Sequence, residues 1–207
     1  MSGLKAVLVH APTYIALQRI VGADRLRYRC FAQLELSPGD AVVDVGCGPA
    51  YYLDRLPEQI RYHGFDTEPR YIEWARKRWG ERGSFHLGRF DEEQAAALHP
   101  VAAVLLLGVL HHLSDTEATD LLGLVAQALS PSGQVVAVDT CVEPEQGKIS
   151  RWMSTHDRGE YVREPEAFVE LARQRFENVE GMVLSNLTRI PSSHWMMRMG
   201  RPRADVS

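Results

Sequence analysis

The sequence predicts an α/β protein with a doubly wound, mostly parallel sheet that ends in a C-terminal antiparallel hairpin. Apolar runs with little polar alternation recur along the chain, as in strands that are covered on both faces. Segments with helical periodicity separate these runs, which is typical of strands joined by crossover helices. Two further apolar runs over 178–199 have no helical segment between them, so they predict the hairpin.

Composition limits the class of protein. The chain has 207 residues, of which 45% are hydrophobic and 24% are charged, and this favours one globular domain and excludes general disorder. The longest uncharged apolar run, 101–110, is about half of the roughly 20 residues that cross a bilayer, so no transmembrane segment is expected. The N-terminus lacks the pattern of a secretory signal, which predicts a cytoplasmic protein.

Net charge and cysteine content exclude further classes of protein. A net charge of −4 is unlike the basic surface of a general phosphate-backbone binder, so no nucleic-acid partner is expected. Cys30, Cys47 and Cys141 lie far apart in the sequence and are odd in number. They therefore predict reduced thiols, with neither a disulfide framework nor a metal site.

Five apolar runs predict the central strands of the sheet. These runs cover 41–46, 60–66, 84–88, 101–107 and 134–140. An amphipathic segment over 14–34 precedes the first strand and predicts a helical cap. The C-terminal hairpin is expected to turn near Asn186, and Pro191 limits how early its last strand can pair.

Capping signals predict where the helices begin. Thr67 is a suitable cap for a helix that follows the second strand. Ser114 and Glu117 have the reciprocal spacing of a capping box, so a helix is expected to start there. Another helix is expected to begin at Pro165, because proline favours the first helical turn.

A glycine turn follows the first predicted strand. In this architecture ligands bind beyond the carboxyl ends of the strands. Gly46 and Gly48 allow backbone conformations and a close approach that side chains would prevent, and the helix expected next would offer free N–H groups. Asp66 ends the second strand, and a carboxylate there can accept hydrogen bonds from both hydroxyls of a ribose.

Two cofactor classes fit a glycine turn that is followed by such an acid. A dinucleotide-binding turn requires a small residue at position 51, but the sequence has Tyr51. The other pattern, D-x-G-x-G-x-G, is found in class I S-adenosylmethionine-dependent methyltransferases. The chain resembles that family, because Asp44, Gly46 and Gly48 match the motif, with Ala50 in place of the third glycine.

The resemblance extends beyond the first motif. Asp66 is similar to the family's ribose-binding acid, and 105–113 follows its L-x-x-V-L-H-H-L stretch. The small stand-alone type called methyltransferase domain 11 is the most similar group. The resemblance implies a Rossmann-like seven-stranded sheet, with S-adenosylmethionine as cofactor and S-adenosylhomocysteine as product. The implied cofactor-binding residues are Asp44, Gly46, Cys47, Gly48, Asp66, Thr67, Phe90, Asp91, Leu107, Gly108 and His112.

One contact that the family makes with adenine is missing from the sequence. Family members commonly carry an aspartate directly after the glycine that ends the third strand, but this chain has Arg89. Either Asp91 supplies the acceptor from a shifted turn, or the backbone does so with the ring of Phe90 beside the adenine.

The chemistry requires little of the protein, because a sulfonium is an activated methyl donor. The acceptor must be held at attack distance with water excluded, and a base accelerates attack by a hydroxyl by about 10²- to 10⁴-fold. His112 is the candidate catalytic base because it follows the fourth strand; the alternative is that it only hydrogen-bonds locally or packs at the pocket wall. His111 is not expected to face the ligand as well, because neighbouring side chains on the same turn cannot both face it.

The polar stretch over 148–163 follows the fifth strand, where the family usually builds its acceptor site. The candidate substrate-binding residues are Trp152, His156 and Tyr161 from this stretch, and Tyr14 and Gln18 from the N-terminal segment. Loops at this edge often carry specificity, but an ordinary surface connection is an equal alternative.

The sequence therefore predicts one methyltransferase domain over 1–207. A helical cap (1–36), a cofactor-binding core (37–140) and an acceptor-side loop, helix and hairpin (141–207) would compose it. The expected reaction is in-line methyl transfer to a small molecule. The alternatives are a nicotinamide-dependent oxidoreductase and a non-catalytic cofactor-binding partner protein. The sequence leaves the acceptor, the methylated atom and the oligomeric state open.

Overall fold

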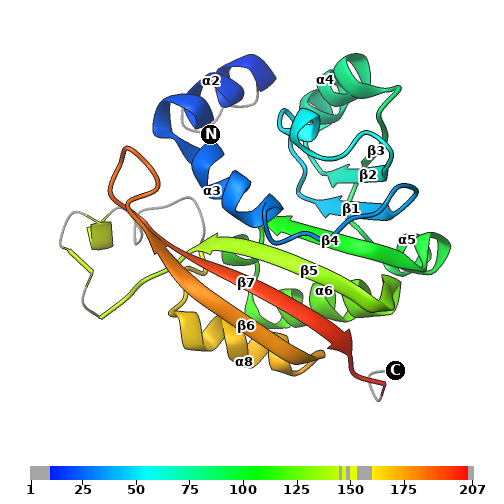
Figure 1. Cartoon of the computed structure of the whole chain (residues 1–207). Coiled ribbons are helices and arrows are strands. Elements are labelled where there is room, and N and C mark those ends of the chain that lie inside the picture. The colour runs from blue at the N-terminus through cyan, green and yellow to red at the C-terminus, as the bar shows by residue number, and fades with distance from the viewer. Residues whose placement is uncertain (1–9, 145, 148–149, 153–159, 205–207) are drawn as a thin grey trace.

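The computed structural model describes residues 10–144, 146–147, 150–152 and 160–204. It contains a seven-stranded sheet in the order β3-β2-β1-β4-β5-β7-β6 (Figure 1). The strands are β1 (Ala41–Val45), β2 (Arg61–Asp66), β3 (Gly83–Leu87), β4 (Val101–Leu107), β5 (Leu129–Thr140), β6 (Phe176–Ser185) and β7 (Ser193–Pro202). Strands β1 to β5 are parallel, and β7 is antiparallel to both β5 and β6. The predicted fold class, including the C-terminal hairpin, is confirmed.

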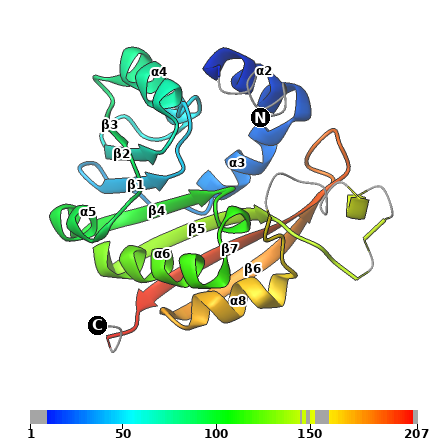
Figure 2. The same ribbon diagram turned by 180° about the vertical axis from the view of Figure 1, so that it is seen from behind.

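Helices cover both faces of the sheet. On one face lie α5 (Glu92–Leu98), α6 (Asp115–Ala128) and α8 (Pro165–Arg173), which are in front of the sheet in Figure 2. On the other face lie α2 (Ala11–Val21), α3 (Ala23–Phe31) and α4 (Pro69–Trp79). Val104 and Leu106 of β4 pack into the first layer, and Ala103 and Leu105 pack into the second. This alternation explains why β4 is apolar along its whole length.

The helix starts follow the capping signals with one difference. Ser114 and Glu117 form the predicted capping box at the start of α6. At α4 the N-cap is Glu68, whose side chain accepts a hydrogen bond from the backbone N–H of Arg70, whereas Thr67 is exposed. The prediction of Thr67 as the cap was therefore wrong by one residue, because Pro69 is the first helical residue and the cap directly precedes it.

The segment after the glycine turn differs from the expectation. Instead of a full helix, it contains one turn of 3-10 helix, η1 (Leu53–Arg55). The buried rings of Tyr51 and Tyr52 and the N-terminal helices fill this part of the layer. The segment over 14–34 forms two helices, because Gly22 adopts a left-handed conformation with φ 84° between α2 and α3.

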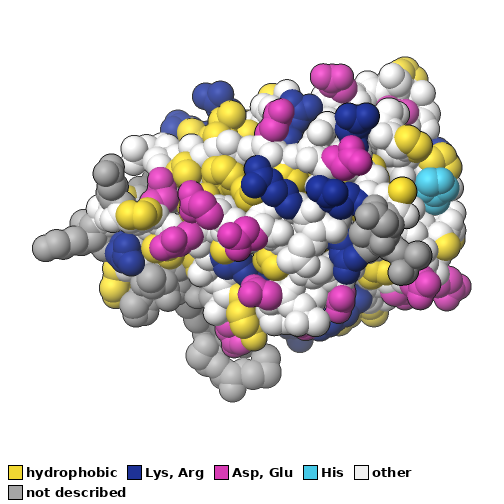
Figure 3. Space-filling view, turned by 90° about the horizontal axis from the view of Figure 1, so that it is seen from below, with side chains coloured by type: hydrophobic (Ala, Val, Ile, Leu, Met, Phe, Trp, Pro, Cys, Tyr) yellow, Lys and Arg dark blue, Asp and Glu magenta, His cyan; other side chains and the backbone are white. Residues whose placement is uncertain are grey.

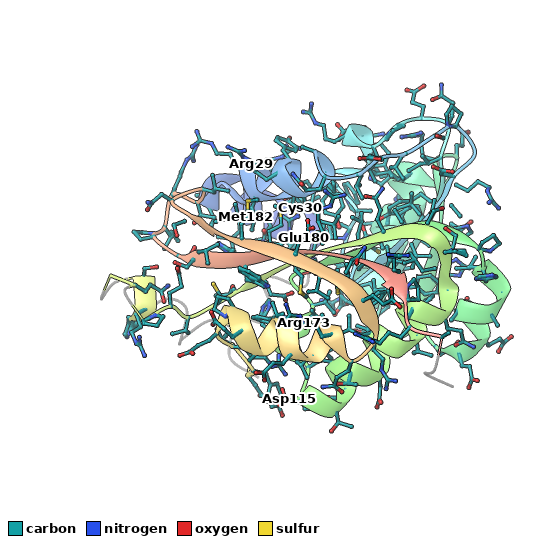
Figure 4. The ribbon with its side chains drawn as sticks, turned by 60° about the horizontal axis from the view of Figure 1, so that its bottom comes forward. Arg29, Cys30, Asp115, Arg173, Glu180 and Met182 are labelled. Carbon is teal, nitrogen blue, oxygen red and sulfur yellow. The ribbon has the colours of Figure 1, made fainter. Side chains whose placement is uncertain are left out.

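The hairpin completes the sheet at one edge. Its turn begins at Asn186, which has a φ of 59°, and β7 lies inside while β6 is the edge strand. Figure 4 shows Met182 on β6 between α3, which carries Arg29, and α8, which carries Arg173. Within the described part of the chain, no helix has the length and apolar character required to span a membrane.

Candidate functional site

The carboxyl ends of the parallel strands share one edge of the sheet. In both ribbon views α3 lies beside the end of β4 at this edge (Figures 1 and 2). The turns after β1, β2 and β4 carry most of the residues predicted from the motifs. The fold therefore brings these turns together beneath the N-terminal helices.

The glycine turn has the conformation that its sequence predicts. Gly46 and Gly48 have φ values of 74° and 56°, in the left-handed region that favours glycine. A Cβ atom at Gly46 would lie 2.7 Å from a methyl carbon of Val109, so that position has no room for a side chain. At Gly48 the nearest atom would be a ring carbon of Tyr14 at 3.8 Å. Ala50 also has a left-handed φ, of 47°, where the family pattern has its third glycine.

Asp66 joins the first two turns. One of its carboxylate oxygens accepts a hydrogen bond from the Gly48 N–H at 2.8 Å, and the other accepts from the Glu68 N–H at 2.8 Å. Partial burial raises the pKa of Asp66, and the two N–H groups oppose that shift. Each oxygen keeps a further lone pair, so the carboxylate can still accept hydroxyl groups.

Asp44 lies beneath the glycine turn and is fully buried. Its Oδ2 accepts hydrogen bonds from the hydroxyls of Tyr62 at 2.6 Å and Tyr52 at 3.0 Å, and its Oδ1 has no hydrogen-bond partner. Burial raises the pKa of Asp44 to about 7, although the two tyrosine hydroxyls lower it. Tyr52 also donates to the Cys47 carbonyl at 3.3 Å, so Asp44 positions the turn from below.

Three other predicted cofactor residues differ in their surroundings. Cys47 is buried, and a Cβ atom at Gly64 would lie 2.8 Å from its sulfur, which explains the glycine in β2. Gly108 has a φ of 79° and donates its N–H to the Val138 carbonyl at 2.7 Å. Leu107 is buried at the end of β4. Cys47 and Leu107 therefore pack beneath this edge.

The turn after β3 carries the candidate adenine contacts. Phe90 is buried, and its ring meets Phe65 edge-on with ring centroids 5.2 Å apart. Asp91 is the N-cap of α5, where its Oδ1 accepts from the Gln94 N–H at 2.9 Å. Arg89 is exposed and lies 3.7 Å from a carboxylate oxygen of Glu117. Asp91 thus has a structural role as a helix cap.

The two histidines after β4 form a contact that the sequence analysis did not anticipate. His111 is buried, with its Nδ1 2.7 Å from Oδ1 of Asp139, which also accepts the His111 backbone N–H at 3.1 Å. His112 is exposed, and the two ring centroids are 4.1 Å apart. The 3-10 turn η2 (Leu110–His112) places one ring against the other. Asp139 was missed, although an acid at the end of a strand was a signal for it.

Arg163 fixes this turn from the segment that precedes α8. Its guanidinium donates to the Leu110 carbonyl at 2.8 Å and to the Leu113 carbonyl at 2.6 Å, the two sides of the histidine turn. It also pairs with Asp115 at 2.7 Å. The backbone N–H of Tyr161 donates to the His111 carbonyl at 3.0 Å. The segment around Tyr161 is therefore attached to the histidine turn, as the acceptor-site hypothesis requires.

The five predicted substrate residues separate into two groups. Tyr14 packs on Tyr71 with ring centroids 5.1 Å apart and lies beside the glycine turn, and Gln18 is on the same helix. Tyr161 and Trp152 are exposed, the latter by 58%, and belong to the segment after β5. His156 lies outside the described residues. The structure thus places Tyr14 at the glycine turn.

A buried polar cluster connects α3 to the glycine turn. The Tyr51 hydroxyl donates to a carboxylate oxygen of Asp24 at 2.8 Å and accepts from Arg27 at 2.7 Å. Arg27 also donates to the amide oxygen of Gln18 at 3.1 Å. The role of Arg27 is not evident from the sequence, because an arginine in an amphipathic helix usually indicates a solvated face.

Residues 42–133 match the family model described as a methyltransferase domain. This segment therefore resembles a methyltransferase domain in its sequence. The match begins in β1 and ends in β5, so it includes the glycine turn, Asp66 and the histidine turn. The resemblance inferred from the motifs is confirmed at the level of this domain.

Solved structures share the fold of the methyltransferase domain at low sequence identity. A chain from the complex between the Haloferax volcanii Trm112 methyltransferase activator and a methyltransferase has a TM-score of 0.68 and 19% identity, over 86% of this chain and 90% of that one. Human N-acetylserotonin methyltransferase in complex with S-adenosylmethionine has a TM-score of 0.65 and 18% identity, over 92% of this chain and 55% of that one.

A structure named for a different reaction is also similar. The [4+2]-cyclase SpnF has a TM-score of 0.64 and 15% identity, over 86% of this chain and 80% of that one. The comparison with curated proteins gives no match. At these identities the structural likeness shows the fold alone, so the activity must be argued from the site.

Proposed function

We propose that the protein transfers a methyl group from S-adenosylmethionine to a small-molecule acceptor. The observation that carries this proposal is the contact of the Asp66 carboxylate with the Gly48 N–H at 2.8 Å, at the edge where the strands end. This contact places a hydroxyl-accepting carboxylate directly beside a glycine turn. We assign residues 37–140 to cofactor binding on this basis.

The residues at this edge fit an adenosyl ligand. Asp66 would accept the ribose hydroxyls, and Gly48 leaves space that a ligand can approach closely, with Tyr14 at its border. We assign Phe90 and Asp91 to the adenine side, and Leu107 and Gly108 to the wall of the site. When bound, S-adenosylmethionine supplies an activated sulfonium methyl group, and S-adenosylhomocysteine remains after the transfer.

We propose that His111, rather than His112, is the base for a hydroxyl acceptor. Asp139 lies 2.7 Å from Nδ1 of His111, and in the tautomer with the proton on Nδ1 the basic nitrogen would be Nε2. The Cε1 of His111 lies 3.6 Å from the position of a Cβ atom at Gly108, so the ring borders the proposed cofactor wall. His112 would line the acceptor side of the same pocket, together with Tyr161 and Trp152.

A small molecule is the proposed acceptor, in a reducing compartment such as the cytoplasm. Acidic and basic side chains are interspersed on the face shown in Figure 3, unlike the single-sign surface of a general nucleic-acid binder. Cys30, Cys47 and Cys141 are unpaired, which is usual for a cytoplasmic protein. A nicotinamide cofactor is disfavoured, because the buried Tyr51 ring fills the position where its pyrophosphate turn requires a small residue.

Calorimetric titration with S-adenosylhomocysteine tests the cofactor assignment. The wild-type protein should bind it, and Asp66→Ala should weaken binding by about 100-fold or more, because two hydrogen bonds to a charged acceptor are lost. Asp54→Ala is the matched control, since this exposed carboxylate lies outside the site and should not change affinity. Binding of NADH in place of S-adenosylhomocysteine would contradict the proposal.

The acceptor class needs a separate measurement. Methyl-labelled S-adenosylmethionine is incubated with the protein and a cell extract, which is then separated by ultrafiltration. Label in the filtrate supports a small-molecule acceptor, whereas label retained with protein or nucleic acid contradicts it. No transferred label, with intact cofactor binding, would favour the non-catalytic partner protein. Because a similar chain is found with a methyltransferase activator, the assay is repeated with an activator of that type added.

A further inference from the structure

Arg27 is a buried cation that has only neutral hydrogen-bond partners. It lies on the inner face of α3. Its Nη1 donates to the Gln18 amide oxygen at 3.1 Å and to the Tyr51 hydroxyl at 2.7 Å. Its Nη2 makes one long contact, 3.5 Å to the Tyr14 hydroxyl, and its Nε has no hydrogen-bond partner among the residues that the structure describes. One side of the guanidinium, formed by Nε and Nη2, is therefore almost unused.

The positive charge of Arg27 also lacks an ion pair. Among the described residues, no carboxylate oxygen lies within 4.0 Å of its guanidinium. Asp24 is connected to it only through the Tyr51 hydroxyl. A buried charge without a counter-ion is unfavourable, and arginine stays protonated at every relevant pH. An anion placed at the unused donors would therefore supply a direct counter-ion that the described residues do not provide.

The position of this cation indicates which anion would meet it. Its guanidinium carbon lies 5.2 Å and 5.3 Å from the ring centroids of Tyr51 and Tyr52, which follow the glycine turn in the chain. Tyr14, its third contact, lies beside Gly48. The unused donors of Arg27 are therefore next to the turn at which we propose that the cofactor binds, and the α-carboxylate is the one anionic group of that cofactor.

We propose that Arg27 binds the α-carboxylate of the methionyl part of S-adenosylmethionine. The inference rests on the proposed function, since it needs the cofactor to lie at the glycine turn. A carboxylate matches the paired Nε and Nη2 donors of a guanidinium, and it supplies the missing negative charge. Arg27 then selects a complete amino-acid tail, while Asp66 holds the ribose.

Two ligands that differ only in this carboxylate test the assignment by calorimetry. Wild-type protein should bind S-adenosylmethionine about 10- to 100-fold more tightly than decarboxylated S-adenosylmethionine, the usual effect of a hydrogen-bonded charge pair. In Arg27→Met this preference should fall to less than about threefold. Both proteins should bind 5′-methylthioadenosine equally, because that ligand has no amino-acid tail, and this shows that the variant is folded.

Two further variants complete the design. Arg29→Met removes the same charge from the exposed face of the same helix and should keep the wild-type preference (Figure 4). Arg27→Lys keeps the buried charge but loses the paired donors, so its preference should fall several-fold even if Arg27→Met does not fold. A wild-type protein that binds both ligands equally, or an Arg27 variant that keeps the full preference, would overturn the inference. Failure of the wild-type protein to bind any of the adenosyl ligands would instead overturn the proposed function.

Discussion

The two ends of the site differ in how the sequence builds them. At the cofactor end, formed by Gly46, Gly48 and Asp66, the decisive contact joins residues 18 positions apart on successive strands. At the acceptor end, formed by His111, Asp139 and Arg163, the contacts span 28 and 53 positions. Motifs describe short spacings, so they find the glycine turn and the histidine turn but not Asp139 and Arg163, which hold the histidine turn in place. A variant at one end should therefore leave the other end intact.

Replacement of His111 should have the largest effect on the reaction. His111→Ala is expected to reduce methyl transfer to a hydroxyl acceptor by about 10²- to 10⁴-fold, because the base is lost, with little change in S-adenosylhomocysteine affinity. His112→Ala should have a much smaller effect. Rates and calorimetry on both variants measure this, with the pH–rate profile as a further readout. A greater loss of methyl transfer in His112→Ala than in His111→Ala would instead identify His112 as the base, as the sequence motif predicts.

Removal of the Arg163 side chain should destabilise the acceptor end. Arg163→Met would lose its pair with Asp115 and leave the carbonyls of Leu110 and Leu113 without their donor. We expect a decrease of about 3 kcal/mol in the free energy of unfolding, measured by urea denaturation. Binding of S-adenosylhomocysteine should persist below the new midpoint. An equal loss of affinity would show that the two ends are not independent.

The buried carboxylates at the two ends have different partners, and the difference makes the stability of the fold depend on pH. Asp139 faces a histidine, whereas Asp44 faces two tyrosine hydroxyls, and burial raises its pKa to about 7. Folded Asp44 therefore keeps a proton that the unfolded chain releases near its ordinary pKa of 3.8. Its contribution to stability is complete below about pH 4 and is lost as the pH rises through 7.

The variant Asp44→Asn has no titrating group at this position. It therefore tests whether the Asp44 contribution to stability falls as the pH rises. Relative to wild type, the free energy of unfolding of the variant should rise by roughly 2 kcal/mol between pH 5 and pH 7. Urea denaturation at pH 5, 6 and 7 measures the difference. Asp54→Asn, at an exposed carboxylate, should show no such slope. Parallel curves for wild type and Asp44→Asn would mean that Asp44 is ionised in the folded protein throughout this range.

The sequence predicted the bounds of helices and strands well where interactions within the element itself set those bounds. Strand β4 was found at its full length, because a strand buried on both faces must be continuously apolar. The start of α6 was found because Ser114 and Glu117 satisfy each other within one turn. The helix expected after the glycine turn was wrong, since Tyr51 and Tyr52 pack against distant helices that no local pattern reveals.

The sequence by itself determined the α/β fold class, the glycine turn with Asp66 and the resemblance to methyltransferases. These features depend on periodicity and on residues only a few positions apart, or at the ends of successive strands. Only the tertiary structure decided that His111 is buried against Asp139 and that Arg27 lies beside the glycine turn. A buried polar group takes its partner from whatever the packing of distant elements brings within hydrogen-bond distance, and sequence spacing does not encode that distance.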